Sequence, residues 1–251
     1  MNTEPSTAKI ALISGGMGAV GRSAARALVQ EGYRVLLLYR STSQEDVAEA
    51  SRDLGGNVDF IRCDITNDED VAAAINATLS MYGRIDVCIH AAVDRMLRER
   101  LADMDPESFR AQFEAGFFGA FNLFRRVTHI MREQKSGLLI GITSSVIEAG
   151  ATASRMGAYT AAKAALRALL RGFHAELTSY GIRVIAIAPD LMQTPLNADL
   201  PEKYFEFAKG KNAGVALMTP NDVAQVIVRA CGDDSLSGVS ILVSSGAIRP
   251  L

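Results

Sequence analysis

The chain alternates short apolar runs with longer segments in which apolar residues recur at helical spacing. The apolar runs cover residues 9–14, 34–39, 57–63, 84–92, 137–145, 182–189 and 239–245, and the helical segments cover 18–32, 43–54, 67–82, 106–133, 157–180 and 220–231. Runs that are apolar at nearly every position are typical of strands buried on both faces of a parallel sheet. Because crossovers between parallel strands are right-handed, the pattern predicts an α/β fold with a doubly wound, seven-stranded, mainly parallel sheet and helices on both faces.

One irregular segment interrupts the alternation, over residues 190–218. No repeat or Pro/Ser-rich linker divides the rest, so we expect residues 1–251 to form a single domain. Long irregular segments inside compact domains usually serve a function, and we expect this one to be a lid over a substrate site. Its aromatic residues Tyr204, Phe205 and Phe207 could face a substrate, the body of the protein or a second subunit.

The composition limits the partners that this protein can have. Lys plus Arg number 26 against 28 Asp plus Glu, a net charge of −2, so no positive field favours nucleic acid or an anionic membrane. No apolar run approaches the roughly 18 residues of a membrane span, and the N-terminus lacks the features of a signal peptide. The 3 cysteines have no metal-type spacing, so we expect no metal site. We therefore expect a cytoplasmic protein that binds a small molecule.

A glycine-rich segment, Ser14 to Gly21, joins the first predicted strand to the first helix. Glycines let the backbone turn tightly and approach a pyrophosphate, whose charge is met by amides at the helix N-terminus. Its position between strand and helix therefore predicts a dinucleotide-binding loop.

The end of the second strand indicates which dinucleotide binds. An acid there would hydrogen-bond the adenosine ribose, whereas an arginine would pair with a 2′-phosphate. The sequence has Tyr39 at the usual acid position, followed by Arg40 and Ser41. This favours NADP(H) over NAD(H), although a lone Arg at a strand end is more often only solvated.

A candidate proton-transfer pair lies in the helical segment 157–180, where Tyr159 and Lys163 share a face because they are four residues apart. Just upstream, Ser144 and Ser145 end the fifth strand at the sheet edge where ligands bind in such folds. A tyrosine with an ordinary pKa near 10 is a weak acid at neutral pH, and a nearby ammonium with a cationic nicotinamide would lower that pKa. Tyr159 could then protonate a carbonyl oxygen that Ser145 steadies, while Lys163 holds the nicotinamide ribose.

Taken together, these motifs resemble the short-chain dehydrogenases/reductases, in particular the 3-oxoacyl-carrier-protein reductases, over essentially the whole chain. The resemblance implies a Rossmann fold, a homodimer or homotetramer, and an oxidoreductase acting on a carbonyl or alcohol. It implies Ser145, Tyr159 and Lys163 as catalytic residues. The cofactor-binding residues that it implies are Gly15, Met17, Gly18, Ala19, Val20, Gly21, Arg40, Ser41, Asp64, Ile65, His90, Ala91, Ala92, Tyr159, Lys163, Pro189, Met192 and Thr194.

In the glycine-rich loop, Ser14 replaces the family's Thr and Ala19 its middle Gly, both small changes, and three further segments depart from the family pattern. His90-Ala91-Ala92-Val93 stands where the family has Asn-Asn-Ala-Gly, and His90 answers to a structural Asn. Asp190 replaces the Gly of Pro-Gly-x-x-x-Thr, so this loop could be stiffer. Gly116 stands where the family usually has an Asn that supports a water linking the Lys to solvent.

Two functions therefore remain open at the level of sequence. The first is NADPH-dependent reduction of a ketone, such as a 3-oxoacyl thioester or a biosynthetic ketone, to a secondary alcohol. The second is a nucleotide-binding regulatory or interaction protein that has lost turnover, which Gly116, His90 and Asp190 motivate. The substrate pocket is expected near Glu148 to Met156 and the lid, and neither segment has a signature that identifies the substrate.

Overall fold

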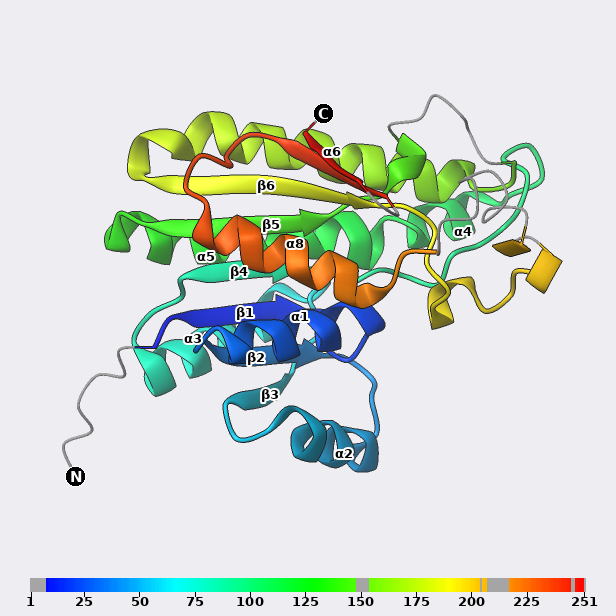
Figure 1. Cartoon of the computed structure of the whole chain (residues 1–251). Coiled ribbons are helices and arrows are strands. Elements are labelled where there is room, and N and C mark those ends of the chain that lie inside the picture. The colour runs from blue at the N-terminus through cyan, green and yellow to red at the C-terminus, as the bar shows by residue number, and fades with distance from the viewer. Residues whose placement is uncertain (1–7, 148–153, 204, 207–216, 245–246, 251) are drawn as a thin grey trace.

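The computed structural model describes residues 8–147, 154–203, 205–206, 217–244 and 247–250 (Figure 1). Its strands form one sheet in the order β3-β2-β1-β4-β5-β6-β7-β8. The strands are β1 (Ile10–Ser14), β2 (Arg34–Tyr39), β3 (Val58–Arg62), β4 (Val87–His90), β5 (Gly137–Ile142), β6 (Ile182–Pro189), β7 (Ser240–Ser244) and β8 (Ala247–Pro250). The α-helices are α1 (Ala19–Gln30), α2 (Gln44–Leu54), α3 (Asp68–Tyr82), α4 (Pro106–Ala111), α5 (Gly119–Gln134), α6 (Gly157–Leu177) and α8 (Pro220–Gly232).

All seven predicted strands are present, and they pair in parallel. The prediction of a doubly wound sheet is therefore confirmed. The structure adds an eighth strand, β8, which pairs antiparallel with β7 at the sheet edge. Within the described ranges, no helix combines the length and the apolar character needed to span a bilayer.

The alternation of side chains along each strand explains the two layers of helices. In β1, Ala11 and Ile13 point into the core cluster that contains the buried faces of α1 and α8, whereas Ile10 and Leu12 point into the cluster under α3, α5 and α6. Figure 1 shows α1 and α8 on one face of the sheet and α6 beyond the other. Both faces are covered, which is why the strands are apolar at nearly every position.

The helix expected over 106–133 is not continuous in the structure. It consists of α4, a π-helical turn over Glu114–Phe118, and α5. The expectation of one helix was wrong because helical spacing of the phenylalanines does not reveal a local widening of the turn. The phenylalanines separate accordingly: Phe124 is fully buried, whereas Phe118 and Phe121 are 47% and 41% exposed.

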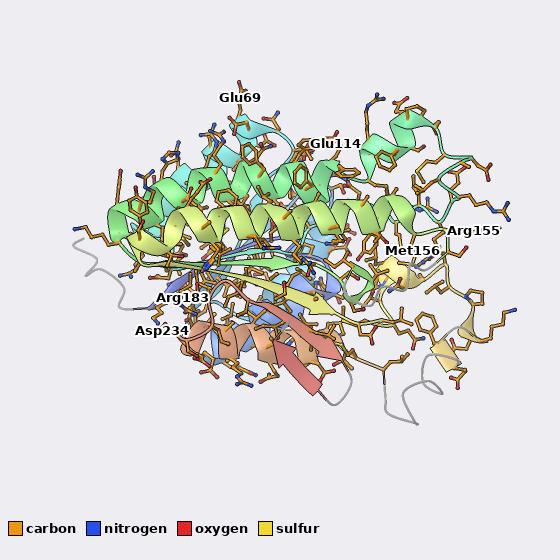
Figure 2. All side chains as sticks on the ribbon, turned by 90° about the horizontal axis from the view of Figure 1, so that it is seen from above. Glu69, Glu114, Arg155, Met156, Arg183 and Asp234 are labelled. Carbon is orange, nitrogen blue, oxygen red and sulfur yellow. The ribbon has the colours of Figure 1, made fainter. Side chains whose placement is uncertain are left out.

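The strand order indicates where on the sheet a ligand should bind. β1 is flanked by β2 and β4, so the chain leaves the carboxyl ends of β1 and β4 in opposite directions. In open α/β sheets, the crevice at such a switch point is where ligands bind. Figure 2 shows Met156, beside the start of α6, at this end of the molecule, and the ion pair of Arg183 with Asp234 (3.2 Å) at the other end.

Candidate active site

A cleft of about 830 Å³ opens at the carboxyl ends of the strands. It extends from the glycine-rich loop to the segment after β6. Thirteen predicted site residues line it: Gly15, Met17, Gly18, Ala19, Val20, Gly21, Ala91, Ser145, Tyr159, Lys163, Pro189, Met192 and Thr194. The remaining six, Arg40, Ser41, Asp64, Ile65, His90 and Ala92, are not part of its lining.

The glycine-rich loop is shaped by contacts that exclude side chains. Gly15 has a φ of +68°, and a Cβ there would lie 2.5 Å from the backbone nitrogen of Ala92. A Cβ on Gly21 would lie 2.4 Å from the carbonyl oxygen of Gly15. Gly18 caps α1 without a side-chain hydrogen bond, and Gly18, Ala19 and Val20 line the cleft, so no capping side chain competes for the first amides of this helix. This loop has the form that a pyrophosphate requires.

The ends of β2 and β3 lie side by side next to the glycine-rich loop. Tyr39 pairs in register with Arg62, and the Nε atom of Arg62 donates a hydrogen bond of 3.3 Å to the carbonyl oxygen of Arg40. Two exposed guanidinium groups therefore lie at neighbouring strand ends. Sequence reasoning missed Arg62, although its place at the end of the third strand was a usable signal.

Asp64 follows β3 and is partly buried. Its Oδ1 atom accepts hydrogen bonds from the backbone nitrogen and the hydroxyl of Thr66, at 3.0 and 2.8 Å. Asn122 of α5 donates to the carbonyl oxygen of Ile65 at 3.1 Å. The turn on which the adenine contact was predicted is thus held on both sides, and its place at the sheet edge is compatible with that contact.

Tyr159 and Lys163 are buried together at the floor of the cleft. The Nζ atom of Lys163 donates to the carbonyl oxygen of Ile142 at 2.7 Å and lies 5.8 Å from the centre of the Tyr159 ring. Burial lowers the pKa of Lys163 to about 8, and the charge of Asp94 opposes this by raising it. Lys163 can therefore exchange a proton close to neutral pH.

Burial raises the pKa of Tyr159, while a hydrogen bond with Ser144 and the charge of Arg98 lower it. The Lys163 ammonium, which we expect to lower this pKa together with a bound nicotinamide, donates to the carbonyl oxygen of Ile142 in the protein alone. In the protein alone Tyr159 is thus a protonated phenol, ready to donate.

The two serines after β5 have different partners. The Ser145 hydroxyl donates to Oδ1 of Asp190 at 3.0 Å, and the same oxygen accepts from the backbone nitrogen of Leu191 at 2.8 Å. Ser144 is the serine that hydrogen-bonds Tyr159. Asp190, which replaces the family's Gly, is thus the hydrogen-bond acceptor of the predicted catalytic serine, Ser145.

Two side chains from the end of β4 hold the π-helical turn. His90 is fully buried, with its Nδ1 atom 2.9 Å from the Ser14 hydroxyl and its Nε2 atom 3.3 Å from the carbonyl oxygen of Gly116. Burial and the charge of Lys163 lower the pKa of His90 to about 3, so the ring is neutral. The Oδ2 atom of Asp94 accepts a hydrogen bond of 2.7 Å from the backbone nitrogen of Ala115.

Arg98 connects the segment after β4 to the predicted lid. It donates to the carboxylate of Asp199 at 2.9 Å and to the Oδ1 atom of the buried Asn197 at 2.7 Å. Asn197 in turn donates to the carbonyl oxygen of Met192 at 3.0 Å. The lid expected over 190–218 is described only as far as residue 206 and again from 217, where Met192 bridges to Met218. Tyr204 and Phe207 lie outside the described residues, and Phe205 is buried.

Glu148 to Arg155, part of the segment expected to build the substrate pocket, is described only from residue 154 onward. Met156, at the end of that segment, lines the cleft together with Arg95, Arg98 and Leu200. The wall around Tyr159 is therefore partly apolar and partly cationic.

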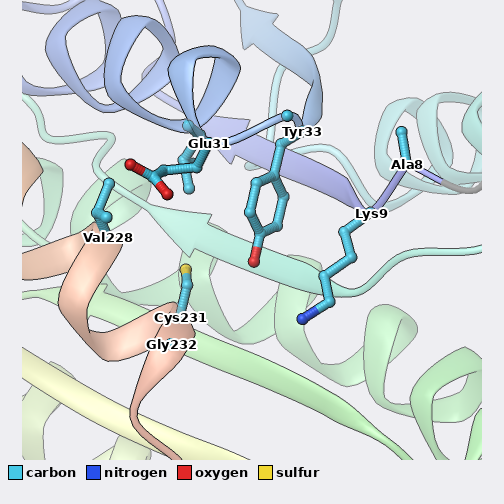
Figure 3. Close-up of a pocket in the computed structure, with 9 residues that line it drawn as sticks. Ala8, Lys9, Glu31, Tyr33, Val228, Cys231 and Gly232 are labelled. Atoms are coloured by element: carbon cyan, nitrogen blue, oxygen red, sulfur yellow. The ribbon is translucent and has the colours of Figure 1, made fainter.

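A second, smaller cavity of about 350 Å³ lies near the beginning of β1, away from these residues (Figure 3). Tyr33 and Cys231 point toward each other in it, and burial raises the pKa of both groups. A thiol held protonated in this way is a poor nucleophile. None of the predicted site residues lines this cavity.

The sheet, the glycine-rich loop and the Tyr159–Lys163 pair define a Rossmann-type, nicotinamide-dependent oxidoreductase, and comparison with known proteins identifies the family. A family model described as enoyl-(acyl carrier protein) reductase matches residues 16–247. Short-chain dehydrogenase reductase 3c of Arabidopsis thaliana is 31% identical over 249 residues, covering 95% of this chain and 93% of the relative. 3-Oxoacyl-(acyl-carrier-protein) reductase of Thermotoga maritima is 28% identical over 244 residues, covering 96% and 98%.

The fold comparison agrees with this. A crystal structure of 3-ketoacyl-(acyl-carrier-protein) reductase from Brucella melitensis, complexed with NADH, superposes with a TM-score of 0.87 at 23% identity, covering 95% of this chain and 97% of that chain. The chain belongs to the short-chain dehydrogenase/reductase family of NAD(P)-dependent oxidoreductases.

Proposed function

We propose that this protein is an NADP(H)-dependent ketoreductase, which reduces a ketone to a secondary alcohol. The observation that carries the proposal is the burial of Tyr159 beside Lys163 at the floor of the cleft that begins at the glycine-rich loop. A relative named 3-oxoacyl-(acyl-carrier-protein) reductase supports a 3-oxoacyl or similar biosynthetic ketone as substrate.

The cleft fits a dinucleotide at its glycine-rich end. The amides at the start of α1 would meet the pyrophosphate, and Ala91 is small enough for the cofactor to lie against the end of β4. Asp64 and Ile65 would contact the adenine, and Pro189, Met192 and Thr194 would lie on the nicotinamide side. When bound, the reduced cofactor supplies the hydride.

NADP(H) is the nicotinamide that we propose, because no acid stands at the end of β2. Arg40 and Ser41 follow Tyr39, and Arg62 adds a second guanidinium from β3. Two cations close together favour a 2′-phosphate, which carries negative charge that a ribose hydroxyl lacks.

Three side chains then have separate roles in the reduction of the carbonyl group. Tyr159 donates its phenolic proton to the oxygen as the hydride arrives at the carbon, and Ser145 steadies the charge that develops on this oxygen. Lys163 stabilises the resulting phenolate and returns a proton to it. Hydride and proton together convert C=O to CH–OH.

The second candidate is a regulatory or interaction protein that binds NADPH without turnover, which Gly116 and Asp190 favour. A panel of ketones and alcohols with both cofactors separates the two. We expect NADPH oxidation with at least one ketone, and a loss of at least about 10³-fold in kcat for Tyr159→Phe, because the general acid is removed. NADPH affinity should change little. Tight NADPH binding without turnover on any ketone would exclude the reductase.

The oligomeric state and the cellular compartment of the enzyme are also part of the proposal. Phe118 and Phe121 are exposed at the start of α5, and burying them against a second copy would make a homodimer or homotetramer built on α5 and α6. We propose that each subunit is a single domain. The oligomer acts in the cytoplasm, and its substrates are small molecules. Light scattering coupled to gel filtration measures the oligomeric state.

A further inference from the structure

A ketoreductase must recover one proton in every turnover. The carbonyl carbon gains the hydride with its two electrons, the oxygen gains the proton of Tyr159, and the nicotinamide ring is left oxidised. The enzyme is then one proton short, and this proton must come from water. Gly116 has no side chain that could support a water between Lys163 and the solvent.

Asp94 is placed to act on Lys163. It lies four residues after β4, lines the same cleft as Tyr159 and Lys163, and is only partly buried. Its Oδ2 atom is fixed by the backbone nitrogen of Ala115, the residue before Gly116. Its carboxylate thus occupies the side of the π-helical turn that faces the cleft.

Two other ionisable groups near Lys163 are neutral, and the carboxylate of Asp190, which lines the same cleft, accepts hydrogen bonds from Ser145 and Leu191. His90, from β4, is neutral because burial lowers its pKa to about 3. Tyr159, on the same helix, is kept protonated because burial raises its pKa. Among the described residues, Asp94 is the anion whose charge raises the pKa of Lys163.

We propose that Asp94 is a positioning residue for Lys163, which keeps the ammonium protonated and connects it to the solvent at the mouth of the cleft. This inference rests on the proposed reductase function. Lys163 gives a proton to the Tyr159 phenolate and becomes a neutral amine. Asp94 then favours uptake of a proton from water by that amine, which restores the starting state.

The test is Asp94→Asn, which keeps an oxygen for the Ala115 amide and removes the charge. Without that charge the pKa of Lys163 falls below about 8, so the alkaline limb of the kcat profile should move about one pH unit lower. We expect kcat at pH 8 to fall about fivefold or more, with NADPH affinity unchanged. Asp103→Asn, an exposed carboxylate on the same connection, is the matched control.

A second variant separates this role from a merely structural one. A Cβ on Gly116 would meet no heavy atom within 4 Å, so the backbone there has room for the first atom of an Asn side chain. Adding Gly116→Asn to Asp94→Asn should restore at least about threefold in kcat at pH 8, because a polar side chain again serves Lys163. An unshifted profile in Asp94→Asn, or a uniform loss that Gly116→Asn does not reverse, would overturn the proposal.

The titration of Lys163 can also be followed without turnover, by NMR of lysine labelled with ¹³C and assigned with Lys163→Arg. A lower pKa in Asp94→Asn supports the proposal even if no ketone is reduced, in which case the reductase function alone has failed. An unchanged pKa of Lys163 in Asp94→Asn would exclude the proposed role of Asp94, whether or not the protein reduces a ketone.

Discussion

The Ser145 hydroxyl has one proton to donate, and its partner decides which reaction step it can assist. In this structure the proton goes to Asp190, across 45 positions of sequence. While that bond is made, Ser145 cannot donate to a carbonyl oxygen. Asp190 is therefore a competitor of the substrate for the group that we propose steadies the developing charge.

Replacing Asp190 by Gly, the residue that the family has here, should release Ser145. We expect kcat to rise about threefold or more, because a hydrogen bond to a charged acceptor is worth about 1.5–3 kcal/mol and no longer has to be broken. Steady-state kinetics with a ketone found in the panel measures this.

The control is the same substitution in a Ser145→Ala background, where the gain should disappear. If the gain persists there, competition for the hydroxyl is not its cause. If Ser144→Ala rather than Ser145→Ala stops turnover, the catalytic serine is Ser144, which hydrogen-bonds Tyr159.

Residue-level prediction from sequence depended on motifs with fixed spacing. Tyr159 and Lys163 were selected because residues four positions apart on a helix share a face, and the structure places both, buried, in one cleft. Asp94 and Asp190 act through partners 21 and 45 positions away, and an acid in a connection has no periodic signal. Contacts of this kind require the folded chain.

At the level of elements, the neighbouring ends of β2 and β3 set the predicted cofactor preference. We expect Arg40→Ala to weaken NADPH binding about tenfold or more and to leave NADH binding nearly unchanged, because only NADPH has the 2′-phosphate. Arg62→Ala should weaken NADPH binding by a smaller factor. Fluorescence titration with both cofactors measures each affinity.

Arg52→Ala, at an exposed position on α2, is the matched loss of one positive charge and should leave both affinities alone. Wild-type protein that binds NADH as tightly as NADPH would contradict the preference. The same holds if Arg40→Ala does not change NADPH affinity.

The helices and strands that could be predicted from the sequence are those whose burial produces a clear apolar pattern. The central strands are buried on both faces, so their apolar runs were visible, and each was found to within a few residues. β8 was missed because Ala247–Pro250 is short and joins the sheet only by pairing with β7. The π-helical turn was missed because it depends on His90 of β4 and on Asp94 of the connection after β4, which are distant in sequence.

For the whole molecule, the buried His90 couples folding to pH. Its pKa is about 3 in the folded protein and about 6.5 in an unfolded chain. Between these values the unfolded chain binds a proton that the native protein does not, so stability is lost as pH falls through this window. The contribution is about 2 kcal/mol between pH 6.5 and 5.

His90→Asn should therefore flatten the decline of unfolding free energy in that window, measured by urea denaturation at several pH values. His129→Asn, an exposed histidine on α5, is the control and should keep the wild-type slope. A His90→Asn protein that loses stability as steeply as the wild type would show that other groups cause the acid sensitivity.

Arg98 has a consequence for how this enzyme could change under selection. The same guanidinium fastens the segment at Asn197 and Asp199 and lowers the pKa of Tyr159. A substitution that removes Arg98 would widen the cleft and also raise the pKa of Tyr159, the proposed general acid. If the proposed reduction holds, a broader substrate range at this position would cost speed, and a more permissive descendant would need a replacement cation first.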